Sequence, residues 1–153
     1  MLRISKLTDY GTVILADLAD CKSGLASTAE VSARTGLGLP TVQKLLKMLA
    51  RSGLVEAQRG ARGGYRLARK PDDISAADVI DALEGPVSLT ECSVADRHCE
   101  IEAQCTVGSA WQRINTAIRR ALSDISLTDL QTSSARVSRL NFAGMPIHIE
   151  PKN

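Results

Sequence analysis

Aromatic side chains are scarce in this chain of 153 residues, where one Trp, two Tyr and one Phe make up 3% of the sequence. Binding to single-stranded nucleic acid relies on aromatic platforms for the bases, so this mode of binding is not expected. The chain also lacks paired carboxylates, a Ser-His-Asp set and a glycine-rich phosphate loop, and we expect that it is not an enzyme. No internal repeat is present, and the length suits one compact domain, or such a domain with an appended helix.

Long apolar runs are missing as well. The first twenty residues contain an apolar run that Asp9 and Asp17 interrupt, and they contain no small-residue cleavage site. The sequence therefore predicts neither a signal peptide nor a membrane span. Four cysteines without a secretory signal favour a reducing, cytoplasmic compartment, where thiols stay free for metal or redox chemistry.

Charge is unevenly distributed, although the formal net charge is only +2. Residues 1–70 hold twelve Lys and Arg against five Asp and Glu, a net charge of +7, whereas residues 71–153 hold seven against twelve, a net charge of −5. A basic segment of this kind indicates nucleic-acid binding, with a solvated basic face as the plainer alternative. Because aromatic side chains are few, we expect double-stranded DNA as the partner.

The basic half contains, in order, the first elements of a helix-turn-helix. Thr8 can cap a first helix with one buried apolar stripe. The stripe consists of Tyr10, Val13, Ile14, Leu18 and Cys21. Cys21 is therefore interpreted as a buried core thiol rather than a ligand. A capping box over Ser27–Glu30 starts a second short helix, which the glycines at positions 36 and 38 end.

A third helix over residues 40–51 opens with Pro40, and it has the pattern of a DNA recognition helix. Its apolar residues, predicted to be buried, are Val42, Leu45, Leu46 and Leu49. Strands over residues 54–57 and 65–67 flank a glycine turn and form a wing, to which Arg59, Arg62 and Arg66 bring charge for phosphates or the minor groove. The residues predicted to contact DNA are Thr28, Pro40, Thr41, Gln43, Lys44, Lys47, Arg51, Arg59, Arg62 and Tyr65.

The acidic half predicts a connector helix, a cysteine loop and a long helix. Ser75 can cap a helix over residues 76–84 that ends at Gly85-Pro86, while residues 87–108 show little periodicity. A helix from about Ser109 to Ile125 then carries a near-heptad apolar stripe, which favours pairing with a second copy of the chain. Packing of this helix on its own domain is the alternative. The stripe consists of Trp111, Ile114, Ile118, Leu122 and Ile125.

The predicted fold is mainly α with a small β-wing: a winged helix-turn-helix plus a long dimerisation helix. We divide the chain into a DNA-binding domain at 1–70, a connector helix and cysteine loop at 71–108, a dimerisation helix at 109–130 and a largely disordered tail at 131–153.

Three cysteines, Cys92, Cys99 and Cys105, lie within fourteen residues. Their C-x6-C-x5-C spacing is too wide for the C-x2-C pairs of structural zinc sites. Three soft thiolates on one loop suit an iron–sulfur cluster instead. A zinc site or a thiol–disulfide switch that controls DNA binding is the alternative, and an iron–sulfur carrier protein is a further one. A carrier has no use for a glycine-turned arginine hairpin behind a recognition helix.

The chain to about residue 130 resembles the iron–sulfur winged-helix regulators typified by IscR, NsrR and RirA. The resemblance rests on the opening LRISKLTDYG, the wing RGARGGYRL, the helix end ALEGP and the cysteine loop before a Trp-bearing helix. EGPVSLTEC and WQRIN look most like regulators of the SUF iron–sulfur assembly operon. The resemblance implies a homodimeric repressor with one cluster per subunit, whose affinity for its DNA operator changes with cluster status.

The resemblance also implies a ligand set: Cys92, Cys99 and Cys105 match the three cysteine ligands. Gly108 stands where IscR-like members have a histidine, so the IscR-type set is absent. Asp9 matches the carboxylate that NsrR-like members contribute from the other subunit, but it is equally interpretable as a carboxylate at a helix N-terminus. His98 is a weaker alternative. NsrR-like and RirA-like relatives favour [4Fe–4S] over [2Fe–2S].

The recognition helix departs from the IscR-like pattern. Where IscR-like members have Ser and a Glu-Gln pair, this chain has Pro40 and Gln43-Lys44. Glutamine can pair with adenine and lysine with guanine, so the resemblance implies a different operator.

Overall fold

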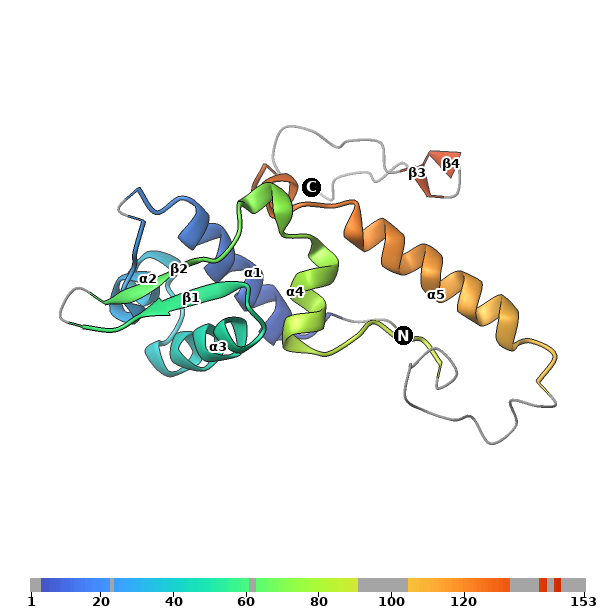
Figure 1. The fold of residues 1–153 in the computed structure, drawn as a ribbon, viewed down its shortest axis with the longest axis horizontal. Helices are drawn as coiled ribbons and strands as arrows, with labels where there is room; N and C mark the ends of the chain where they lie inside the picture. Colours follow the sequence, from blue (N-terminus) through green and yellow to red (C-terminus); the bar gives the residue numbers. More distant parts are fainter. Residues whose placement is uncertain are drawn as a thin grey trace.

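Helices dominate the part of the chain that the structure, a computed structural model, describes (Figure 1). The described residues are 4–22, 24–60, 63–90, 105–132, 141–142 and 145–146. In chain order the elements are α1 (Lys6–Ala19), α2 (Thr28–Thr35), α3 (Leu39–Arg51), β1 (Val55–Gln58), β2 (Gly64–Leu67), a 3-10 helix (Pro71–Asp73), α4 (Ala76–Leu83), α5 (Gly108–Ser123), α6 (Leu127–Gln131), β3 (Asn141–Phe142) and β4 (Met145–Pro146). The mainly α fold with a small β-wing is confirmed.

Helix α1 begins earlier than the sequence analysis predicted. Its N-cap is Ser5, whose hydroxyl accepts a hydrogen bond from the Thr8 backbone N–H at 3.4 Å, so the prediction that Thr8 caps the helix was wrong. Thr8 is instead buried, with 3% of its surface exposed. The buried stripe is also rotated, because Val13 is 42% exposed while Gly11 and Leu15 lie inside. Ser5, three residues before Thr8, has the same capping chemistry and takes the N-cap role.

Helices α2 and α3 form as predicted because local signals agree with the packing. In the capping box, the Ser27 N–H donates to Glu30 Oε2 at 2.7 Å and the Glu30 N–H donates to Ser27 Oγ at 3.2 Å. Gly36 ends α2 with a φ of 72°, in the left-handed region that favours glycine. The four buried residues of α3 are the four predicted: Val42, Leu45, Leu46 and Leu49.

Strands β1 and β2 pair antiparallel and form the wing, with Val55 opposite Leu67 and Gln58 opposite Gly64. The wing is fastened to the segment between α1 and α2 by two backbone hydrogen bonds: Ala26 N–H donates to Tyr65 O at 2.9 Å, and Tyr65 N–H donates to Ala26 O at 2.8 Å. Gly64 permits this approach, because a Cβ there would lie 2.7 Å from Ala26 O. We call α1, α2, α3 and the wing the reading head.

Helix α4 packs across α1 and brings the end of the connector to the start of the chain. A Cβ on Gly11 would collide with the tip of the Leu83 side chain, so the glycine leaves room for Leu83 between the two helices. Beyond Leu83, the Glu84 carboxylate accepts hydrogen bonds from the Ser5 backbone N–H at 3.0 Å and from the Thr8 hydroxyl. These hydrogen bonds lower the pKa of Glu84 below its ordinary value, the Thr8 hydroxyl contributing most.

Helix α5 leaves the reading head with its Gly108 end farthest away (Figure 1). The helix predicted from about Ser109 to Ile125 is present as α5, but the segment 109–130 is not one helix, because α5 ends at Ser123 and Ser126 caps the separate helix α6. Leu127 of α6 is fully buried in the core, and its N–H donates to Ile74 O at 2.7 Å. Burying Leu127 requires the chain to turn back, so the C-terminal end of α5 is anchored to the head.

Four predicted site residues lie outside the described residues: Arg62, Cys92, His98 and Cys99. Most of the tail predicted to be disordered also lies outside them. Within it the structure describes β3 and β4, which pair with Asn141 opposite Pro146. Among the helices that the structure describes, none has the length and apolar character needed to cross a membrane.

Candidate nucleic-acid interface and cysteine site

The outer face of α3 is polar and basic. Apolar residues on one side of the helix turn into the core and leave the opposite side in solvent. The predicted DNA-contacting residues that are exposed on this face are Pro40, Gln43, Lys44, Lys47 and Arg51, and Thr41 is half-buried beside them. The N-cap of α3 is Gly38, which has no side chain to accept a hydrogen bond from the N–H groups of the first turn. A helix start of this kind suits a phosphate.

Leu39 also lies on the outer face of the reading head, and the sequence analysis missed it. It is the first residue of α3 and is 42% exposed, one turn before Gln43. The sequence pattern gave no signal for this, because Leu39 continues the helical spacing of Val42 and Leu46 and would be expected in the core; it is exposed at the first residue of α3.

The wing brings one free arginine and one paired arginine to the interface in its described part. Arg59 is exposed where the turn begins. Arg66, predicted to face DNA phosphates, instead donates to Glu56 across the hairpin at 2.7 and 2.9 Å. The pair is more than half exposed, so it adds little stability, but it neutralises the charge of Arg66 locally.

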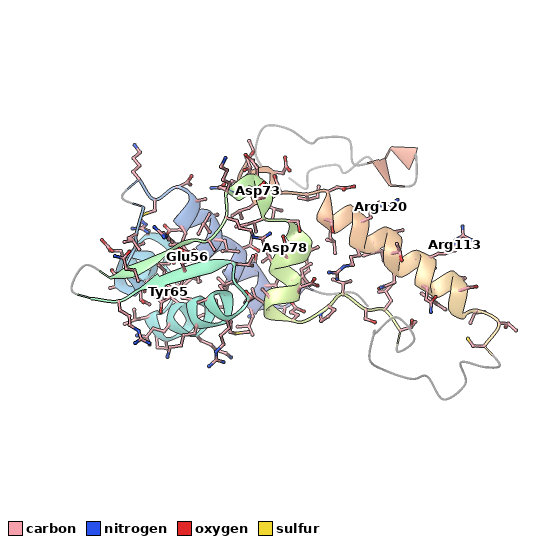
Figure 2. All side chains as sticks on the ribbon, viewed as in Figure 1. Glu56, Tyr65, Asp73, Asp78, Arg113 and Arg120 are labelled. Carbon is pink, nitrogen blue, oxygen red and sulfur yellow. The ribbon has the colours of Figure 1, made fainter. Side chains whose placement is uncertain are left out.

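Two further predicted contact residues have structural surroundings. Tyr65, labelled on the wing in Figure 2, packs against the core as a partly buried side chain. Its backbone N–H and carbonyl form the two hydrogen bonds with Ala26 that hold the wing. Thr28 is half-buried in the first turn of α2. Sequence patterning could not separate Tyr65 from a surface aromatic, because the contact with Ala26 joins segments far apart in the chain.

A bidentate ion pair fixes α1 against α2. Arg34 Nε and Nη2 each donate to the Asp17 carboxylate at 2.7 Å, and this contact raises the pKa of Arg34 above its ordinary value. The pair holds the helices that support α3 in a defined orientation.

The cysteine site is described only at its edges. Cys105 is a free, half-buried thiol just before α5, and a Cβ on Gly108 would lie 3.5 Å from its Sγ. Gly108 therefore leaves the space beside the thiol open. No group of three His, Cys, Asp or Glu side chains arranged for a metal occurs among the described residues, which do not include Cys92 and Cys99.

Asp9 is exposed in the first turn of α1. Its carboxylate does not cap the helix, because Ser5 does so. Within the described part of the chain it accepts no hydrogen bond and forms no ion pair, so it is accessible to a ligand or to the partner subunit.

Cys21 lies between α1 and α2, half-buried and packed against the core, away from the cysteine loop in sequence. Its thiol lies 3.6 Å from the carbonyl oxygen of Leu25. The interpretation of Cys21 as a packing residue agrees with these surroundings, although it is less deeply buried than predicted.

A helix-turn-helix with a basic outer face and an attached β-wing defines a winged-helix DNA-binding transcription regulator. The chain belongs to the Rrf2 family, described as iron-dependent transcriptional regulators, whose family model matches residues 4–133. Its relatives are regulators and not enzymes.

Curated relatives match most of their own length. A putative HTH-type transcriptional regulator, ORF2 of Azotobacter vinelandii, is 35% identical over 87% of this chain and 81% of the relative. The HTH-type transcriptional regulator IscR of Cereibacter sphaeroides is 34% identical over 88% of this chain and 90% of the relative.

Solved structures of transcription regulators have a similar fold. CymR, titled the global cysteine regulator of B. subtilis, aligns with a TM-score of 0.66 at 34% identity, covering 88% of this chain and 99% of CymR. IscR of T. potens aligns with a TM-score of 0.62 at 32% identity, covering 87% and 88%.

Proposed function

We propose that this regulator represses iron–sulfur cluster assembly (SUF) genes and senses cluster or iron status through a bound [4Fe–4S] cluster in the cytoplasm. The cysteine pattern carries the proposal: three thiols fall within fourteen residues between α4 and α5, in a family described as iron-dependent. Thiolates are the ligands that iron–sulfur clusters prefer.

Cys92, Cys99 and Cys105 would hold the cluster, with Asp9 of the partner subunit as the fourth ligand and His98 as the alternative. The Asp9 carboxylate, which is exposed and has no hydrogen-bond or ion-pair partner among the described residues, supports this set, as does the lack of a side chain at Gly108 beside the Cys105 thiol. An oxygen ligand binds iron less firmly than a thiolate, and a labile cluster suits a sensor. When bound, the cluster would supply a centre that can change its oxidation state and that can be lost from the protein.

A homodimer is the proposed assembly, and α5 is the proposed interface. Val107, Trp111 and Ile114 lie on one face of α5 and its N-terminal edge, and they are 55%, 42% and 44% exposed. An apolar stripe of this kind on a single helix is stabilised when another apolar surface covers it. A second copy provides the matching stripe by symmetry, and two-fold dimers are the common readers of duplex operators.

In the proposed complex, α3 enters the major groove and the wing contacts the backbone or minor groove. Gln43 and Lys44 are exposed for base edges, while Lys47 and Arg51 further along α3 suit phosphates. Of the two wing arginines that the structure describes, Arg66 is paired with Glu56, whereas Arg59 forms no ion pair with a described carboxylate and suits a phosphate.

The decisive experiment is anaerobic purification with iron and sulfide quantified, followed by DNA binding of the loaded and the metal-free forms. We expect about four irons and four sulfides per subunit. Alanine variants of Cys92, Cys99 and Cys105 should each lose the cluster and keep the fold, while Cys21→Ala, the matched control, should keep both. A coloured Cys92→Ala protein and a colourless Cys21→Ala protein would contradict the ligand assignment.

A thiol–disulfide or zinc switch is the second candidate. The solved structures that resemble this chain include CymR, titled a cysteine regulator, and an oxidised form of Staphylococcus aureus CymR at 27% identity with a TM-score of 0.60. A colourless anaerobic protein whose DNA affinity responds to oxidants, with a disulfide detected by mass spectrometry, would favour the switch. Stoichiometric zinc in that protein would favour the metal alternative.

A further inference from the structure

Leu39 is an exposed apolar side chain in a basic surface. Among the described residues of α2, α3 and the wing, it is the one large apolar side chain that is exposed, at 42%. It belongs neither to the buried core cluster nor to the partly buried apolar residues packed against that cluster. Substituting it therefore removes little core packing.

The position of Leu39 is the part of a recognition helix that meets base edges. The N-terminal residues of the second helix of a helix-turn-helix contact bases in the major groove, and Leu39 is the first residue of α3. Gly38 before it has no side chain, and nothing lies within 4 Å of the position that a Cβ there would occupy. The backbone just before Leu39 is therefore uncovered, and Leu39 itself is 42% exposed.

The chemistry of an apolar side chain at this position selects one base. In the major groove, thymine presents a C5-methyl group, which none of the other three bases carries. We propose that Leu39 is a specificity-determining residue that packs on the C5-methyl group of an operator thymine. This inference rests on the proposed function, because it requires α3 to lie in the major groove.

Gln43 extends the prediction to a neighbouring base. It lies one helical turn after Leu39 on the exposed edge of α3, and glutamine pairs with adenine through two hydrogen bonds. The operator half-site is therefore expected to place the thymine read by Leu39 close to an adenine read by Gln43. Lys47, another turn along α3, is exposed and contacts a phosphate in this arrangement.

Uridine substitution in the operator tests the proposal directly, since deoxyuridine is thymine without the methyl group. A preferred duplex is first selected from a random pool with the full-length dimer, and each thymine is then replaced by deoxyuridine in both half-sites. We expect one thymine position whose replacement weakens binding about ten-fold, from about three- to four-fold per half-site for one buried methyl group. Binding is measured by fluorescence anisotropy at fixed salt.

The variant Leu39→Ala is then tested against the same thymine and deoxyuridine duplexes, so that the protein change and the DNA change are combined in one double-mutant cycle. It should bind the thymine and deoxyuridine duplexes equally well, whereas Leu39→Met, which keeps an apolar contact, should keep most of the discrimination. Lys47→Ala is the matched control: it should weaken binding to both duplexes by the same factor, so the ratio stays near that of the unchanged protein. Circular dichroism confirms that each variant is folded.

Three results would overturn the inference. Uniform tolerance of deoxyuridine would show that no thymine methyl group is read, and an unchanged ratio in Leu39→Ala would assign the methyl contact to another residue. Loss of self-association in Leu39→Ala, with the ratio unchanged, would make Leu39 an interface residue. If the unchanged protein does not distinguish the selected duplex from a scrambled one, DNA reading itself fails, a result separate from these three.

Discussion

Replacing Gly64 by alanine should loosen the wing from the reading head. The added Cβ would lie 2.7 Å from Ala26 O and 2.9 Å from Ala26 C, where ordinary contacts begin at 3.4 Å. The obstacle is backbone and not the tip of a flexible side chain, so the two segments have to separate. Separation lengthens the two hydrogen bonds between Ala26 and Tyr65.

The size of the effect follows from those two hydrogen bonds. Each backbone hydrogen bond contributes about 1 kcal/mol, and Ala26 is 1% exposed, so water does not readily replace the lost partners. We expect the free energy of unfolding to fall by about 2–3 kcal/mol. For a chain of this size this corresponds to a decrease in Tm of roughly 4–12 °C.

Thermal denaturation followed by circular dichroism measures this change, at one protein concentration for all variants because a dimer melts in a concentration-dependent way. Gly38→Ala is the matched control, since nothing lies within 4 Å of its would-be Cβ and its φ is −59°. Its effect should stay within about 0.5 kcal/mol, because reduced freedom of the unfolded chain offsets a poorer N-cap. Equal melting temperatures for the two variants would refute the steric argument.

Four further predictions concern DNA, the dimer, the cluster and pH. Arg59→Ala should weaken DNA binding by about 1–3 kcal/mol and make it less dependent on salt, as measured by anisotropy titrations. Ile114→Glu should convert the dimer to a monomer in sedimentation velocity, because it places a charge in the exposed apolar stripe. Asp9→Ala should give a more labile cluster and DNA affinity that no longer follows cluster state, as monitored by anaerobic absorption spectra and binding. Glu84→Gln should lower the free energy of unfolding by up to about 1 kcal/mol at pH 7, because glutamine accepts the same hydrogen bonds without charge. Since these hydrogen bonds lower the pKa of Glu84 from 4.5, the difference should persist above pH 4.5 and shrink as the pH falls through the lower folded-state pKa in urea titrations.

Each of these has a control within the chain. Arg66→Ala should change DNA affinity much less than Arg59→Ala, because Glu56 already neutralises Arg66; equal losses would contradict the assignment of Arg59. Thr116→Glu, on the exposed opposite face of α5, should leave the dimer intact. An Asp9→Ala protein with normal cluster lifetime and regulation would leave His98 as the candidate ligand. A Glu84→Gln difference that grows in acid would reverse the expected sign.

Local rules predicted the helix-turn-helix and the wing well. The Ser27–Glu30 box, Gly36 and Pro40 act within a few residues, and the burial pattern of α3 repeats with the period of a helix. These signals need no knowledge of distant segments.

Contacts between distant segments account for what was missed. The break between α5 and α6 exists because Leu127 is buried beside Ile74, and the position of Tyr65 depends on Ala26. The pairing of Arg66 with Glu56 required the register of the hairpin. The cysteine ligands, in contrast, stay predictions, since Cys92 and Cys99 lie outside the described residues.

Among the described residues, contacts hold α5 to the rest of the chain from Asn115, which accepts a hydrogen bond from the Leu89 N–H, to its C-terminal end, so the N-terminal end of the helix can act as the arm of a lever. Near its C-terminal end, Arg119 donates through Nη1 and Nη2 to the carboxylate of Asp81 in α4, while the face carrying Arg113 and Arg120 points away from α4 (Figure 2). From Arg119 to Gly108 the helix rises about 16 Å at 1.5 Å per residue. A displacement of about 3 Å at the Cys105 end would thus tilt α5 by about 10° about its anchored end. Because each arm of a two-fold dimer would tilt in the opposite sense, a small rearrangement of the cysteine loop would change the angle between the two reading heads by about twice that amount.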